Sequence, residues 1–129
     1  MRQRGLKLYF DGGCQPNPGE MEVAVVARGV THYRPRLGHG TNNEAEWIAL
    51  LFALEIAKQL GETDIVIVGD ADLVVNQAKG LWKCRSPDLQ EHLTAFNLLS
   101  PDFSRIRIRS VRRSQNLAGI ALAKQHAGI

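Results

Sequence analysis

Three acidic residues stand where segments of different hydrophobic pattern meet. Asp11 closes an alternating apolar segment, Glu46 lies in the first turn of a long predicted helix, and Asp70 follows a short apolar run. Three carboxylates gathered at one edge of a sheet would repel one another unless a divalent cation neutralised them. Carboxylate oxygens are hard ligands that suit Mg²⁺ or Mn²⁺. The sequence therefore predicts a metal site built from these three acids.

Each acid also has a purely structural interpretation. Asp11, which precedes Gly12, could be a turn residue, and Glu46 could complete a capping box that begins at Asn43. Asp70 could cap the helix that follows it. Their joint placement favours the metal site, because ligands of α/β sheets bind at the carboxyl edge, where strand ends meet.

The elements that must position these acids alternate between strands and helices. Alternating or continuous apolar patterns predict strands, and apolar spacing of three to four residues predicts helices. The predicted strands cover residues 6–10, 23–27, 31–37, 65–68 and 105–109, and the predicted helices cover residues 43–61, 72–79, 87–99 and 116–126. The first three strands would form an antiparallel meander, and the run at 65–68 reads as a buried parallel strand. We expect an α/β fold with a five-stranded mixed sheet and helices packed on it.

Length and composition fit a single domain over residues 1–129. The chain is 44% hydrophobic and 22% charged, and it can bury a core without disulfides or a structural metal. No apolar run approaches the length of a membrane span, and the first residues do not resemble a signal peptide. Cys14 and Cys84 lack a CxxC spacing, so we expect two free thiols. These features predict a cytoplasmic monomer that does not bind membranes.

Positive charge is concentrated at the C-terminal end. Residues 103–129 contain six Lys or Arg residues and no acid, whereas the whole chain has a net charge of +3. Such a segment suggests a polyanionic partner, because Lys and Arg attract phosphates and release their counterions. A solvated strand face is the alternative.

Three ordered motifs resemble the signatures of type 1 ribonucleases H. They are residues 10–19, FDGGCQPNPG; residues 41–46, TNNEAE; and residues 69–76, GDADLVVN. The resemblance implies a ribonuclease H-like fold along nearly the whole chain. It also implies an endonuclease that cleaves the RNA strand of RNA/DNA hybrids with two divalent cations, Mg²⁺ or Mn²⁺.

By this resemblance, Asp11, Glu46 and Asp70 are the first three catalytic acids and the metal ligands. Asp11 and Asp70 would be shared between the two metals, and Glu46 would bind one of them. Two such cations about 4 Å apart would activate a water for in-line attack and stabilise the leaving 3′ oxygen.

The family's fourth acid is absent. In the ungapped comparison it falls on Ile120, and no Asp or Glu follows Asp102. Asn116, one helical turn earlier, could supply a neutral oxygen and is included among the expected catalytic residues; it could instead cap the last helix. The histidine of the family's flexible loop is also missing, because Arg112 and Arg113 occupy that stretch.

The resemblance also implies a set of substrate-binding residues. Those expected to touch RNA sugars and bases or the DNA strand are Cys14, Asn17, Asn42, Asn43, Asn76, Trp82 and Lys83. For Trp82, burial in the core is the alternative. The leading hypothesis is a hybrid-specific endoribonuclease; the alternatives are a catalytically impaired hybrid-binding domain and a related nuclease that acts on DNA or double-stranded RNA.

Overall fold

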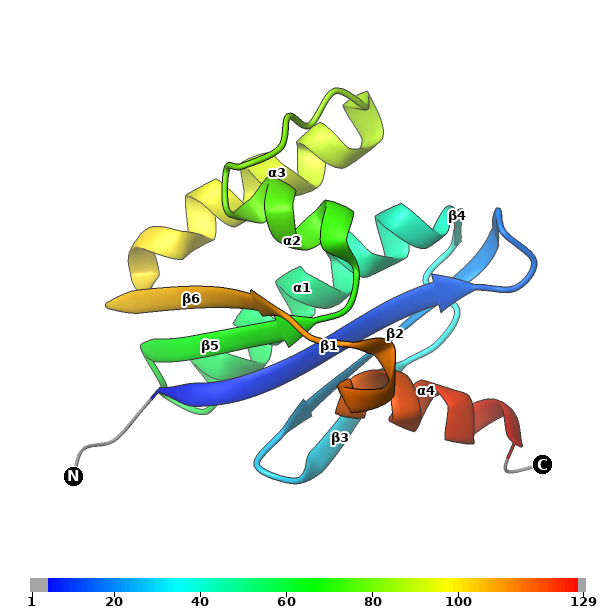
Figure 1. The fold of residues 1–129 in the computed structure, drawn as a ribbon, viewed down its shortest axis with the longest axis horizontal. Helices are drawn as coiled ribbons and strands as arrows, with labels where there is room; N and C mark the ends of the chain where they lie inside the picture. The colour runs from blue at the N-terminus through cyan, green and yellow to red at the C-terminus, as the bar shows by residue number, and fades with distance from the viewer. Residues whose placement is uncertain (1–4, 128–129) are drawn as a thin grey trace.

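A mixed β-sheet with helices on both faces forms the structure, a computed structural model that describes residues 5–127 (Figure 1). The strands are β1 Leu6–Cys14, β2 Gly19–Ala27, β3 Val30–Arg34, β4 His39–Gly40, β5 Asp64–Gly69 and β6 Arg105–Ser110. The helices are α1 Asn42–Gln59, α2 Asp72–Ala78, α3 Pro87–Leu99 and α4 Leu117–Ala127, with short 3-10 turns at Ser100–Asp102 and Arg113–Gln115.

The strand order is β3-β2-β1-β5-β6, and the short strand β4 pairs with β2. β1, β2 and β3 form an antiparallel meander, whereas β5 runs parallel to both β1 and β6. The predicted α/β class and mixed sheet are confirmed. The two-residue strand β4 was not predicted, because two residues are too few for an alternating pattern.

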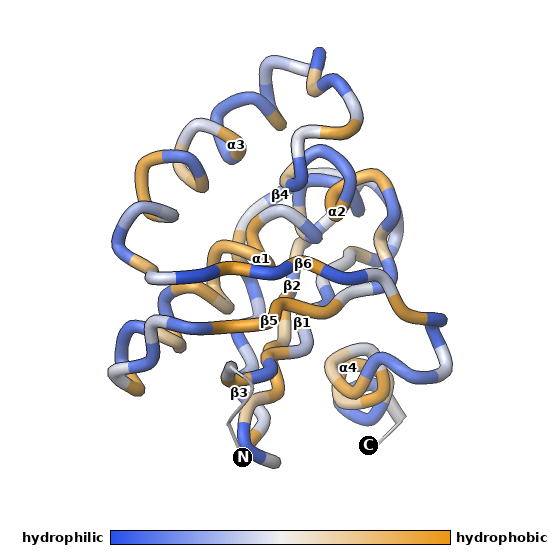
Figure 2. Tube along the Cα trace, turned by 60° about the vertical axis from the view of Figure 1, so that its left-hand side comes forward, coloured by the Kyte–Doolittle hydropathy of each residue, from blue (hydrophilic) through white to orange (hydrophobic). Residues whose placement is uncertain are grey.

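The two faces of the sheet are covered differently. α1, α2 and α3 cover one face over a large core that includes Phe10, Trp47 and Ile67. α4 packs on the opposite face, where Ala118 and Leu122 meet β2. Hydrophobic colour is continuous over most of β5, whereas β6 alternates between hydrophobic and hydrophilic residues (Figure 2).

β1 is longer than its apolar pattern suggested. The prediction that a turn begins at Gly12 is wrong, because Gly12 and Cys14 still pair with β2. A side chain at position 12 would meet the carbonyl oxygen of Ala45, since a Cβ built there would lie 2.3 Å from it. The glycine therefore allows α1 to pack directly on the strand.

The ends of α1 differ slightly from the sequence prediction. The N-cap is Thr41, whose Oγ1 accepts a hydrogen bond from the backbone N–H of Glu44 at 3.2 Å. Glu46 consequently lies in the second turn and does not complete a capping box with Asn43. The predicted stop is confirmed, because Gly61 follows the C-cap residue with φ +72°.

Among the helices of residues 5–127, none is both long and apolar enough to cross a bilayer.

Candidate active site

Asp11, Glu46 and Asp70 meet at one edge of the sheet. Each offers a carboxylate oxygen that lies within 4.8 Å of the oxygens offered by the other two. The pairing of β1 with β5 ends where Tyr9 faces Val68, and β1 continues beyond it with β2 alone. Asp11 therefore lies in the middle of β1, just past the last residue of β1 that pairs with β5. This position puts it beside Asp70, the residue that follows β5.

Glu46 reaches this edge from α1. Its Oε1 accepts a hydrogen bond from the backbone N–H of Gly12 at 3.1 Å. The contact holds the carboxylate beside its neighbour Asp11, and it depends on the close approach of α1 to β1. The same glycine therefore permits the packing and donates the positioning hydrogen bond.

The electrostatics of the cluster favour a cation. Burial, and next the charge of Asp70, raise the pKa of Asp11 to about 6. Burial, followed by the charge of Asp11, raises the pKa of Glu46 well above its ordinary value. Both carboxylates thus hold protons more tightly than they would in water, because burial disfavours their charged forms and the neighbouring carboxylates repel them. Three clustered carboxylates offer hard oxygen donors that fit a divalent cation such as Mg²⁺ or Mn²⁺.

Asp11 and Glu46 open into a cleft of about 960 Å³ between the strand β1, the start of α1 and the helix α4, whereas Asp70 lines a neighbouring pocket. Ile120 of α4 lines this cleft together with Asp11 and Glu46, and 41% of its surface is exposed. An apolar side chain thus occupies position 120 in the wall of the cleft.

Asn116 is fully buried and has a different environment. Its Nδ2 donates to the backbone carbonyl of Phe10 at 2.9 Å, and its Oδ1 accepts from the backbone N–H of Ala118 at 3.1 Å. The side chain caps α4 and ties the helix to β1 next to Asp11. Both of its polar atoms are used inside the protein.

The sequence and the fold of this chain are both similar to those of known proteins. A family model described as reverse transcriptase-like matches residues 10–126. The crystal structure of RNase H1 from Halobacterium salinarum superposes with a TM-score of 0.87 at 32% identity, covering 96% of this chain and 98% of that one. The chain belongs to the ribonuclease H family.

Other ribonucleases H are similar at lower identity. The N-terminal RNase H domain of Rv2228c from Mycobacterium tuberculosis gives a TM-score of 0.82 at 28% identity, over 96% of this chain and 99% of that one. LC11-RNase H1, whose structure is a complex with an RNA/DNA hybrid, gives 0.78 at 28% identity, over 86% and 88%.

The chain is shorter than its curated relatives. It is 37% identical to the ribonuclease HI of Halobacterium salinarum over 93% of its own length, which is 63% of that protein. It is 34% identical to the bifunctional protein Rv2228c over 90% of its length, which is 34% of that protein.

In this ribonuclease H domain, Cys14, Asn17 and Asn42 form one group at the rim of the cleft. Asn42 Oδ1 accepts from the backbone N–H of Cys14 at 2.9 Å, and Asn17 Oδ1 accepts from the backbone N–H of Asn42 at 3.0 Å. The three residues line the cleft, whereas Asn43 is exposed on the first turn of α1. Both cysteines are free, as predicted.

Asn76, Trp82 and Lys83 lie away from that group, on α2 and the α2–α3 connection. Trp82 is 49% exposed, so its burial in the core is excluded. Asn76 Nδ2 donates to the backbone carbonyl of Asp72 at 2.9 Å. Gln77, which the sequence did not single out, joins this connection to the core: it donates to the carbonyl of Lys83 at 3.2 Å and accepts from Trp47 Nε1 at 2.9 Å.

Two further basic residues, Arg113 and His126, line the cleft and were not predicted as site residues. Arg113 borders both the cleft and a smaller pocket of about 560 Å³ that contains Asp70 and Asp72, and its charge opposes the rise in the pKa of Asp11. His126 contacts Glu22 at the far end of the cleft. The concentration of arginines after residue 103, and the place of Arg113 in the stretch that resembles the family's flexible loop, were the sequence signals for Arg113.

Proposed function

We propose that this domain is a metal-dependent endoribonuclease that cleaves the RNA strand of RNA/DNA hybrids. The observation that carries the proposal is the cluster of Asp11, Glu46 and Asp70 in a ribonuclease H fold, where Asp11 and Glu46 line an open cleft and Asp70 lines the adjoining pocket. A domain that only bound nucleic acid would gain nothing from three carboxylates facing phosphates, because like charges repel.

The three carboxylates would hold two Mg²⁺ or Mn²⁺ ions. Such ions supply water activation and neutralisation of the charge that develops on the leaving oxygen. Asp11 in β1 and Asp70 just after β5 would be shared between the two ions, and Glu46 of α1 would hold one of them. The hydrogen bond from the Gly12 N–H keeps the Glu46 carboxylate turned toward Asp11.

Selection of the hybrid would come from the residues around the cleft. Asn17 and Asn42 are exposed at the rim beside the buried Cys14, and polar groups of this kind read 2′-hydroxyls across a wide minor groove. Trp82 and Lys83 are exposed and supply an aromatic surface and a positive charge for the DNA strand. Asn43 and Asn76 complete the proposed contact set.

Ile120 supports one alternative, a hybrid-binding domain with impaired catalysis. An apolar side chain occupies the wall of the cleft at position 120, where the motif resemblance implies a fourth acid. In that case the domain would bind the hybrid without cutting it.

A cleavage assay with three substrates separates these possibilities. Labelled RNA/DNA hybrid, double-stranded RNA and double-stranded DNA are incubated with Mg²⁺ or Mn²⁺, and binding is measured alongside. We expect cleavage of the hybrid's RNA strand alone, loss of cleavage in Asp70→Asn, and near-normal cleavage in the matched variant Asp72→Asn. Binding of the hybrid without cleavage would support the alternative, and cleavage of the other duplexes would indicate a broader nuclease.

A further inference from the structure

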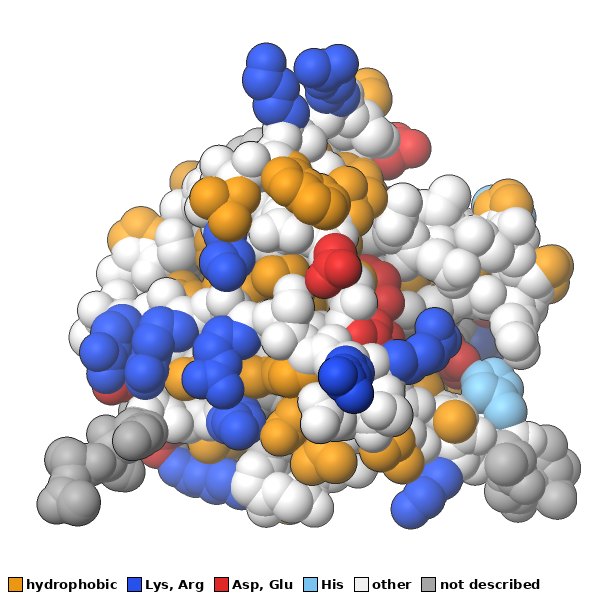
Figure 3. Space-filling model, in the orientation of Figure 1, with side chains coloured by type: hydrophobic (Ala, Val, Ile, Leu, Met, Phe, Trp, Pro, Cys, Tyr) orange, Lys and Arg blue, Asp and Glu red, His pale blue; other side chains and the backbone are white. Residues whose placement is uncertain are grey.

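A basic surface lies beside the acidic cleft and takes no part in the contacts proposed above. We call it the basic sheet face; its residues are Lys7, Arg105, Arg107, Arg109 and Arg112. On the face of the molecule shown in Figure 3, a band of Lys and Arg side chains extends from one side toward the acidic patch at the centre.

The strand register sets this surface. In β6, Ile106 and Ile108 belong to or pack against the core, so the alternating arginines point to the opposite face of the sheet. Arg107 pairs in register with Val66 of β5, which in turn pairs with Lys7 of β1. Two cationic side chains from different strands therefore flank the same buried valine.

α4 leaves this half of the sheet open. It packs against β1 and β2, where it meets Ala24 and Val26, and β5 and β6 lie beyond it. Val66 and Val68 on the open half are nevertheless buried. The surface above β5 and β6 is thus charged and offers no apolar patch to a protein partner.

Negative charge compensates only part of this surface. Asp64 accepts from Arg105 at 3.0 Å and from Arg107 at 3.5 Å. Within residues 5–127, Lys7, Arg109 and Arg112 make no ion pair. The excess positive charge is therefore available to a polyanion.

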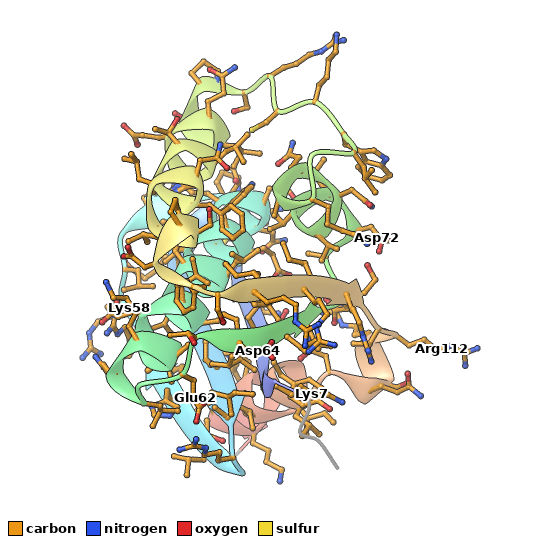
Figure 4. All side chains as sticks on the ribbon, turned by 90° about the vertical axis from the view of Figure 1, so that its left-hand side faces the viewer. Lys7, Lys58, Glu62, Asp64, Asp72 and Arg112 are labelled. Carbon is orange, nitrogen blue, oxygen red and sulfur yellow. The ribbon has the colours of Figure 1, made fainter. Side chains whose placement is uncertain are left out.

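The basic sheet face leads directly to the acids. Val111, just after β6, donates its N–H to the carbonyl of Gly69 at 2.9 Å, and Ser110 Oγ donates to Asp72 at 3.1 Å. Arg112 and Asp70 line the same pocket. Figure 4 shows Lys7 and Arg112 on one side of the view and Lys58 and Glu62 on the other.

We propose that the basic sheet face binds the phosphate backbone of the duplex that extends from the cleft. This inference rests on the proposed function, and it adds a contact separate from Trp82 and Lys83. Alternate residues of a strand are about 6.6 Å apart, so Arg105, Arg107 and Arg109 form a row that can follow successive phosphates. Such contacts are electrostatic, independent of sequence and sensitive to salt.

Binding is tested in an Asp70→Asn background, which prevents cleavage, with a short hybrid that covers the cleft and a longer hybrid that extends past it. The test variant is Lys7→Gln with Arg109→Gln, neither of which breaks an ion pair. The matched control, Arg28→Gln with Lys58→Gln, removes the same charge from exposed ion-paired residues elsewhere. Thermal unfolding verifies that both proteins are folded, and Arg109→Glu provides a second test variant.

We expect the test variant to lose about tenfold in affinity for the long hybrid at about 50 mM salt, with a salt slope shallower by about 1 to 2. The test variant should bind the short hybrid as tightly as the parent protein does. The control variant should bind both hybrids as tightly as the parent protein does. Equal salt slopes for test and control variants would overturn the inference, and so would preferential binding of an acidic protein with unchanged hybrid affinity. Cleavage of the hybrid is then measured in the same variants with Asp70 in place. If they cleave the hybrid although the binding results oppose the inference, only the inference about the basic sheet face fails. If the protein with Asp70 in place does not cleave the hybrid, the proposed function is refuted.

Discussion

Position 120 is the single residue that most directly tests how the metals would be held. Ile120 lines the cleft beside Asp11 and Glu46. We expect Ile120→Asp to lower the divalent metal concentration for half-maximal hybrid cleavage by about tenfold, because the number of charged ligands tunes affinity over orders of magnitude. Leu117→Asp is the matched control, since Leu117 is a similarly exposed residue of α4 that does not line the cleft.

Asn116 supplies the contrasting case. Asn116→Asp retains the acceptor for Ala118 but removes the donor to the Phe10 carbonyl and buries a charge there. It should lower the free energy of unfolding by about 2 to 3 kcal/mol without reducing the metal requirement. A metal requirement lowered by Asn116→Asp and unchanged by Ile120→Asp would contradict the geometry.

The raised pKa of Asp11 predicts a pH dependence of stability in the metal-free protein. Its pKa rises from 3.8 to about 6 in the fold, chiefly through burial, so the folded state binds more protons than the unfolded state within this window. The free energy of unfolding should therefore decrease as pH rises from about 4 to about 6. Denaturant unfolding at several pH values should show a weaker decrease in Asp11→Asn; identical profiles would argue against this explanation.

At the scale of elements, the contact of β1 with α1 is the one that positions the acids. A methyl group at position 12 would lie 2.3 Å from the backbone oxygen of Ala45, and neither backbone can yield cheaply. Gly12→Ala should cost about 2 to 4 kcal/mol of stability and reduce cleavage, because α1 and Glu46 must shift. At Gly13 the nearest atom is Asn42 Oδ1 at 3.4 Å, so Gly13→Ala should be much milder. Equal effects on unfolding and activity would contradict this role of α1 packing.

The same elements show what the sequence could predict. Spacing of apolar residues located every long element, and the three motifs identified the acids, because those signals are local. The full length of β1 could not be read from the pattern, since Gly12 and Gly13 have no side chains and owe their strand conformation to β2. Asn116 remained ambiguous because its partner Phe10 is 106 residues away. Gln77 was missed for the same reason: its partner Trp47 belongs to another helix.

Across the whole molecule, charge is divided between an acidic edge and a basic sheet face. The sequence predicted the excess of arginines after residue 103, and the packing of Ile106 and Ile108 against the core shows which side of the sheet the arginines of β6 occupy. The acidic edge joins three elements that are distant in sequence, β1, α1 and the end of β5. Repulsion among its carboxylates opposes folding, and a bound cation reverses that effect.

Metal binding should therefore stabilise the entire fold. A ligand that binds only the folded state at about 100 times its Kd contributes about 2.7 kcal/mol, which for a domain of this size raises Tm by about 10 °C. Thermal unfolding with increasing Mn²⁺ or Mg²⁺ should show this rise in the wild-type protein and in Asp72→Asn, whose carboxylate lies outside the cluster. Asp70→Asn and Glu46→Gln should start with equal or higher Tm in chelator, because one charge of the crowded edge is gone, and should respond weakly to the ions. An equal metal-induced rise in Asp70→Asn and wild type would show that the ions bind elsewhere.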